Sequence, residues 1–306
     1  MTTAELESFY ESIVLRARAR GTPCAITSGM ACVHYGVAQT TKDCDVLCPP
    51  DAADLMLGVV GEANLAGATA RYRGHLSPPL DSRWLQGGWT SHFEWGQADA
   101  QAYLDVFGIP PRTSSPWEPE VNGLFAHPHT VGEMKRTNRD KDWPFATALG
   151  VKLLKAGDAR GWCHIFGADV LSQMVAEFEC PAEIIARRPV LQLALGKDRR
   201  LRGALHAELM FWHELDRVRM QVYRRALRPY VVAMGRARIP MEADFVSAHR
   251  ARLVCAEAAL NPAPLRDFGF DHLLAETLAG TEEILGTRVY FDWLPDVRDN
   301  FMFLLS

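Results

Sequence analysis

Short apolar stretches separated by polar turns fill the first 110 positions and predict strands alternating with helices. Residues 1–21 form an amphipathic segment that predicts an opening helix. The small residues after "CAITS" favour a short helix packed closely on a sheet, and "DCDVLC" is typical of a buried strand. A helix is expected from "PPDAADLM", with Asp51 as its N-cap or first-turn acid. Further strands are expected in "ATARYRGH", "GWTSHFEWG" and "QAYLDVFGI", with a hairpin connection at residues 96–100.

Helical periodicity replaces this pattern from about residue 130, in segments that extend over residues 130–157, 168–178, 200–235 and 240–260. The prolines of "GIPPRTSSPWEPE" predict a stiff connector before it. The chain is therefore expected to have an α+β fold. We predict a domain over residues 1–150, with a mixed β-sheet flanked by helices, and an all-helical domain over residues 151–306.

Composition places the chain among globular proteins. Its 306 residues are 48% hydrophobic and 23% charged, and no apolar run approaches the ~20 residues that cross a bilayer. Seven scattered cysteines without a CxxC pair argue against a disulfide framework and against a zinc ribbon. We expect a cytoplasmic protein with reduced thiols and no membrane partner.

The charge is segregated along the chain, although the net charge is only -4. Residues 187–238 hold 13 Lys or Arg against four Asp or Glu, so the remainder is acidic. This basic segment has two interpretations: a solvated helix face, or a surface for a phosphate-bearing partner.

Two aspartates, Asp43 and Asp45, stand one residue apart in a predicted strand. Side chains at positions i and i+2 of a strand point to the same face, so two like charges are brought together. Such a pair repels unless a cation neutralises it, and a divalent metal ion would do so. Cys44 between them points to the opposite face and is expected in the core.

The order of elements around these aspartates resembles the nucleotidyltransferase superfamily of the polymerase-beta kind. Its signature is a Ser-Gly turn followed by Asp-x-Asp, matched here by Ser28-Gly29 and, after thirteen intervening residues, by Asp43 and Asp45. A later strand carries a third carboxylate in that family, and "AYLDVFG" supplies Asp105. The similarity covers about residues 20–155.

A second part of the likeness lies in "EMKRTNRDKDWPFATALG", which is similar to bacterial nucleotidyltransferase-like proteins, including abortive-infection toxins. Those proteins carry a lysine and an Arg-x-Lys-Asp run, matched by Lys135, Arg139, Lys141 and Asp142. The resemblance implies a possible cognate antitoxin. It also implies that a nucleoside triphosphate such as ATP is the substrate.

The resemblance implies a role for each residue. Asp43, Asp45 and Asp105 would be catalytic and hold Mg²⁺ or Mn²⁺, with Asp105 nearest the acceptor hydroxyl. The nucleotide-binding residues would be Ser28, Gly29, Lys135, Arg139 and Asp142. The expected reaction moves a nucleoside monophosphate from the triphosphate to a hydroxyl acceptor.

Other interpretations stay open. The acceptor could be RNA or tRNA bound through residues 187–238, a small molecule, or a protein hydroxyl. The fold could also be an inactive module that binds a partner. Lys135 could be an exposed helix lysine, and Asp142 a helix-terminal acid stabilised by the dipole. His92 is expected to be structural and not a zinc ligand.

Overall fold

The computed structural model describes residues 3–41, 43–74, 76–96, 101–114, 121–240 and 243–305. Its main sheet has seven strands in the order β5-β6-β7-β2-β1-β9-β8. Strands β7 and β2 are parallel, as are β1 and β9, and the other neighbours are antiparallel. The mixed sheet predicted from the sequence is therefore confirmed. The strands are β1 (Ala25–Thr27), β2 (Cys44–Leu47), β5 (Arg71–Tyr72), β6 (Thr90–Trp95), β7 (Ala102–Phe107), β8 (Val121–Asn122) and β9 (Phe125–Ala126).

The segment "ATARYRGH" forms two short strands and not the single strand expected. Strand β4 (Ala68–Thr69) pairs with β3 (Asn64–Leu65) in a separate two-stranded sheet, whereas β5 joins the main sheet beside β6. The predicted hairpin at residues 96–100 lies largely outside the described residues, as do residues 115–120 of the predicted connector.

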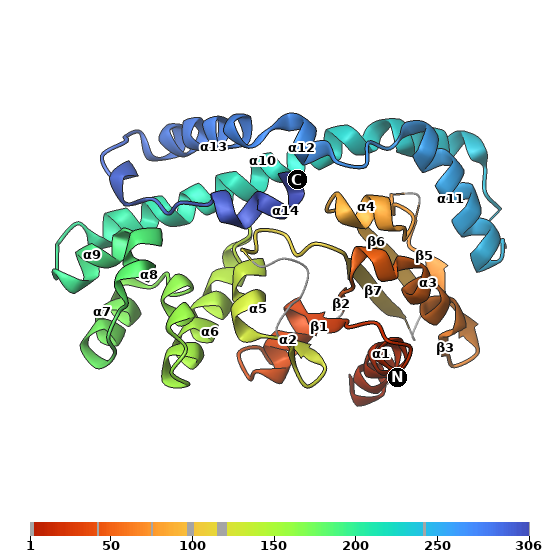
Figure 1. The fold of residues 1–306 in the computed structure, drawn as a ribbon, viewed down its shortest axis with the longest axis horizontal. Coiled ribbons are helices and arrows are strands. Elements are labelled where there is room, and N and C mark those ends of the chain that lie inside the picture. The colour runs from red at the N-terminus through yellow and green to blue at the C-terminus, as the bar shows by residue number, and fades with distance from the viewer. Residues whose placement is uncertain are drawn as a thin grey trace.

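Helices before the last strand pack against the main sheet (Figure 1). In α1, Tyr10, Ile13, Val14 and Ala17 are buried at the spacing of one helix face, which explains the amphipathic pattern of the opening segment. Tyr10 also accepts a hydrogen bond from the backbone N–H of Tyr103, at 2.9 Å. These helices are α1 (Thr3–Ala19), α2 (Ser28–His34), η1 (Pro50–Ala52), α3 (Ala53–Glu62) and α4 (Ser82–Gln86).

Every element described after β9 is helical, as the periodicity predicts. The 37-residue helix α10 runs along much of the molecule's longest axis, with α13 beside it (Figure 1). No helix in the described part of the chain is long and apolar enough to cross a membrane. The elements are α5 (Pro128–Met134), η2 (Asp140–Asp142), α6 (Trp143–Lys155), η3 (Ala159–Cys163), α7 (Ala168–Glu177), α8 (Ala182–Arg187), α9 (Val190–Leu195), α10 (Leu201–Ala237), α11 (Phe245–Ala259), α12 (Pro264–Phe268), α13 (Phe270–Leu285), η4 (Phe291–Trp293), η5 (Arg298–Phe301) and α14 (Met302–Leu305).

Side chains of α10 donate hydrogen bonds to backbone carbonyls near the sheet. Tyr223 donates to the carbonyl of Gly87 at 2.8 Å, and Tyr230 donates to that of Ser77 at 2.9 Å. Gly87 is in close contact with the helical half, since a Cβ there would lie 1.6 Å from the carbonyl oxygen of Pro262. The helical half is therefore fixed to one end of the sheet.

A buried charge cluster makes a second connection between α10 and the sheet region. Asp216 of α10 pairs with Arg112, which follows β7, and with Arg219 one turn further along the helix. The backbone N–H of Asn138 donates to the same carboxylate at 3.1 Å. Burial alone would raise the pKa of Asp216, but the two guanidinium groups and this N–H lower it to about 2.

Asp216→Asn is expected to lower the free energy of unfolding by about 3 kcal/mol at pH 7, because it leaves Arg112 buried without its counter-ion. Because the pKa of Asp216 is lower in the folded protein, its ionised carboxylate stabilises the fold fully above about pH 4, the pKa of an Asp in an unfolded chain. This stabilisation is lost as the pH falls towards 2. Urea unfolding at several pH values measures it. The control is Asp169→Asn, which breaks an exposed ion pair with Arg202. Equal midpoints for Asp216→Asn and this control at pH 7 would contradict the assignment.

Candidate functional site

The Ser28-Gly29 turn joins β1 directly to α2. Ser28 has a φ of 54°, in the left-handed region that residues other than glycine seldom adopt, so the chain turns sharply here. Gly29 is required by close packing, since a Cβ at this position would lie 2.4 Å from Oγ1 of Thr41. The Thr41 hydroxyl lies 3.3 Å from Oδ1 of Asp43. The turn and the first aspartate are thus held together by one threonine.

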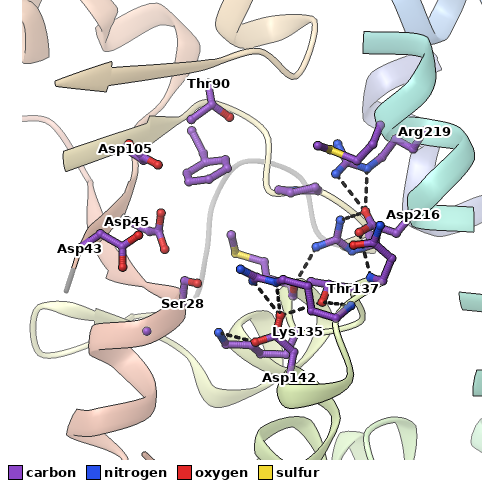
Figure 2. A pocket seen from close by; sticks show the side chains of 18 of the residues that line it. Ser28, Asp43, Asp45, Thr90, Asp105, Lys135, Thr137, Asp142, Asp216 and Arg219 are labelled. Atoms are coloured by element: carbon purple, nitrogen blue, oxygen red, sulfur yellow. Dashed lines mark hydrogen bonds and ion pairs between the residues drawn. The ribbon is translucent and has the colours of Figure 1, made fainter. Parts of the chain in front are cut away.

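Strand register brings the second and third aspartates together. Asp45 of β2 lies opposite Thr27 of β1 on one side and opposite Asp105 of β7 on the other. Directly paired residues of neighbouring strands point to the same face, so the two carboxylates share one side of the sheet. Figure 2 shows Asp43, Asp45 and Asp105 along one wall of a cavity, with Ser28 beside them. Cys44 is fully buried in the core, as expected.

Crowding of these carboxylates alters the proton affinity of Asp45. Its pKa is raised to about 7, first by burial and then by the negative charges of Asp105 and Asp43. A hydrogen bond with Ser28 and the charge of Lys135 act in the opposite direction without cancelling the rise. Asp45 therefore holds a proton more readily than an isolated carboxylate does, chiefly because it is buried.

The Asp105 carboxylate is paired with two side chains that the sequence did not predict as its neighbours. Nη2 of Arg73 lies 2.8 Å from Oδ1 and 3.1 Å from Oδ2 of Asp105. His92, directly opposite on β6, brings Nδ1 within 2.8 Å of Oδ1. His92 is therefore a neighbour of the candidate site and lines the cavity.

Two of the three aspartates are placed to bind a metal ion, and the third is already paired. Carboxylate oxygens are the ligands that Mg²⁺ and Mn²⁺ prefer, and Asp43 and Asp45 both face the cavity. Asp105, however, is engaged by Arg73 and His92. Among the residues that the structure describes, no group of three His, Cys, Asp or Glu side chains is placed to hold a metal.

A buried carboxylate organises the cations of another wall. Asp142, 2% exposed, accepts hydrogen bonds from Nζ of Lys135 at 3.3 Å, from the Thr137 hydroxyl at 2.7 Å and from Nε of Arg139 at 2.8 Å. Burial alone would raise its pKa, but Lys135, Thr137 and Arg139 together lower it below the usual range. Figure 2 shows this cluster across the cavity from the three aspartates.

This cluster corrects the alternative interpretation of Lys135 but not that of Asp142. Lys135 is 5% exposed, so it is not an exposed helix lysine. Asp142 is at the N-cap of α6, where a helix-terminal acid is expected, and its carboxylate binds side chains and makes no capping hydrogen bond. Pro144 follows in the first helical turn, where its missing N–H removes no helical hydrogen bond.

Helix α10 forms a further wall of the cavity, which has a volume of about 1010 Å³. Of the 13 basic residues between 187 and 238, two line it: Arg219 and Arg224. Arg188 is instead buried against Glu208. Most basic residues of this segment therefore do not line the cavity that holds the carboxylates, and belong to other surfaces or to the core.

Gly29→Ala is expected to lower the free energy of unfolding by about 1–3 kcal/mol, because the added methyl group overlaps the Thr41 hydroxyl. In a Thr41→Ala background the same change should cost clearly less. A double-mutant cycle by urea unfolding measures this coupling. An equal effect of Gly29→Ala in both backgrounds would show that this contact does not require the glycine.

Comparison with known family models, with curated proteins and with solved structures finds no match for this chain. We therefore infer the function from the residues of this chain alone. They are the Ser28-Gly29 turn, the three aspartates and the Asp142 cluster across the cavity.

Proposed function

We propose that this protein is a metal-dependent nucleotidyltransferase that transfers a nucleoside monophosphate from a nucleoside triphosphate to a hydroxyl acceptor. The observation that carries the proposal is the shared wall of Asp43, Asp45 and Asp105 beside the Ser28 turn, facing Lys135 and Arg139 across one cavity. Phosphoryl chemistry needs carboxylates for metal ions and cations for phosphate oxygens, and both are present.

Asp43 and Asp45 are the residues that would hold a divalent cation. When bound, such an ion stabilises the attacking and leaving oxygens of a phosphoryl transfer. It would also offset the repulsion that raises the pKa of Asp45. Asp105 is proposed to join this site through its oxygens on the cavity side, while Arg73 and His92 orient the carboxylate.

The triphosphate is proposed to lie between the Ser28 turn and the Asp142 cluster. Lys135 has three N–H donors, and Asp142 takes one of them, so others can reach phosphate oxygens. Arg139 is half exposed at the same wall. In the reaction, the acceptor oxygen bonds to the α-phosphorus, the bond to the bridging α–β oxygen breaks, and pyrophosphate leaves. The hydroxyl proton passes to Asp105.

A second candidate function is an inactive module of the same architecture that binds a partner. The ion pair of Arg73 with Asp105 favours it, because a carboxylate neutralised by an arginine is a weaker metal ligand and a weaker base. The two candidates differ in whether turnover depends on Asp43 and Asp45.

Transfer of label is the direct test. The protein is incubated with Mg²⁺ and each α-³²P nucleoside triphosphate in turn, together with total RNA, a protein extract or a small-molecule extract. We expect label in one acceptor class with the wild type and none with the Asp43→Ala, Asp45→Ala variant. Asp54→Ala, an exposed change on α3, should behave as wild type. Identical labelling by wild type and double variant, or no labelling in any combination, would favour the inactive module.

Two further variants separate the proposed roles once a substrate is known. Asp105→Asn should leave triphosphate binding nearly intact and lower kcat by about 100-fold or more, because it removes a group that acts in the transition state. Lys135→Ala should instead weaken triphosphate binding about tenfold, with Lys155→Ala, an exposed change on α6, as its control. Calorimetry and steady-state kinetics measure both. Normal turnover by Asp105→Asn, or unchanged affinity in Lys135→Ala, would remove that residue from the site.

A further inference from the structure

One stripe of α10 faces the cavity. Met220, Tyr223, Arg224 and Leu227 all line it, at the spacing that places residues on one face of a helix. Arg225 and Arg228 do not line it, although both are exposed. The helix therefore presents a mixed apolar and cationic surface to the cavity.

The apolar part of this surface is only partly covered by the residues that the structure describes. Leu76 lines the same cavity and is 59% exposed, which is unusual for a large aliphatic side chain inside a hollow. Met220 and Leu227 are partly exposed. The Tyr223 hydroxyl is already bound to the carbonyl of Gly87, so Tyr223 offers the cavity its ring and no free polar group.

Arg224 adds the charge. Arg219, one turn earlier, is held by Asp216 at 2.9 Å. Arg224 has no carboxylate partner among the residues that the structure describes, and it is exposed to the cavity. An unpaired arginine beside apolar side chains suits a ligand that has both a flat apolar part and an anionic group.

This region also borders the Asp105 end of the aspartate wall. Phe107, two residues after Asp105 on β7, and its partner Thr90 on β6 line the cavity. Figure 2 shows Thr90 on the side of Asp105 that faces Arg219 of α10. The cavity volume of about 1010 Å³ is at the upper end of the ~300–1,000 Å³ typical of sites for one small ligand. The cavity is continuous from the aspartates to α10.

We infer that the space between Leu76 and the α10 stripe is the acceptor subsite, and that it takes a nucleotide unit. The base would lie against Leu76, Met220 and Leu227, with a phosphate on Arg224 and a ribose hydroxyl towards Asp105. A nucleotide combines the flat apolar face, the anion and the hydroxyl that this subsite calls for. The inference rests on the proposed function and names its acceptor class.

Calorimetry tests the subsite without turnover. The wild-type protein is first saturated with Mg²⁺ and an α,β-methylene nucleoside triphosphate, which cannot transfer its α-phosphate. The four 5′-nucleoside monophosphates, the matching nucleosides and a tetraribonucleotide are then titrated in. We expect a monophosphate or the tetranucleotide to bind, and the nucleoside to bind at least tenfold more weakly. The two nucleotide arms distinguish a free nucleotide from the end of an RNA chain.

Matched variants assign the contacts. Arg224→Gln should weaken nucleotide binding about tenfold and leave nucleoside binding unchanged, whereas Arg225→Gln should stay within twofold of wild type. Leu76→Ser should weaken both ligands. Because these side chains are exposed, the variants should fold normally.

Several results would overturn the subsite. They are equal affinity for nucleoside and nucleotide, equal behaviour of Arg224→Gln and Arg225→Gln, or binding of an acidic peptide in place of every nucleotide probe. Failure of all nucleotide probes while the triphosphate analogue binds would reject the subsite and leave the proposed function standing. If the analogue itself does not bind, both are wrong.

Discussion

Repulsion among three carboxylates is the constraint around which this site is built. Strand pairing places Asp45 directly beside Asp105, and the chain brings Asp43 to the same cavity wall. The pKa of Asp45 is raised to about 7, chiefly by burial and further by the negative charges of Asp105 and Asp43. A protein that needed only a stable sheet would gain by replacing one of these aspartates. Our proposal accounts for their joint presence by a cation that binds there during function.

The cationic side chains around the three aspartates are held in two different ways. Arg73 and His92 hold Asp105 from neighbouring strands, which restrains one carboxylate without closing the cavity. Lys135 and Arg139 are instead bound to Asp142 on another wall, so their positive charge stays near the cavity and does not collapse onto the aspartates. The buried cluster of Arg112, Asp216 and Arg219 fixes α10 as a further wall. The cations of the Asp142 and Asp216 clusters are thus held within their own walls, and the space between the walls remains open.

Much of the fold and part of the site follow from local rules. Alternation within a strand predicts that Asp43 and Asp45 share a side and that Cys44 is buried, and helical periodicity predicts α10 as a long helix. The contacts of Asp105 depend on register between β7, β2 and β6, which no local pattern specifies. For the same reason Arg73 and His92 were not predicted as neighbours of the site. The burial of Lys135 depends on Asp142, seven residues away across a turn, and was left open for that reason.

The basic segment, residues 187–238, is a second case in which local sequence does not specify which side chains reach the cavity. Charge counting detects the excess of arginine in residues 187–238, but the helical phase decides that Arg224 lines the cavity and Arg225 does not. Composition cannot distinguish an arginine that faces a ligand from one that faces solvent or, like Arg188, a buried glutamate. Position relative to the cavity does distinguish them.

The location of a bound metal ion tests most directly whether Asp43 and Asp45 bind a divalent cation. Crystals of the protein with Mn²⁺ and an α,β-methylene nucleoside triphosphate would reveal the ion by its anomalous scattering. We expect a peak about 2.1 Å from carboxylate oxygens of both Asp43 and Asp45, with the triphosphate between the Ser28 turn and Lys135. A peak away from these two aspartates, or phosphates bound elsewhere, would contradict it.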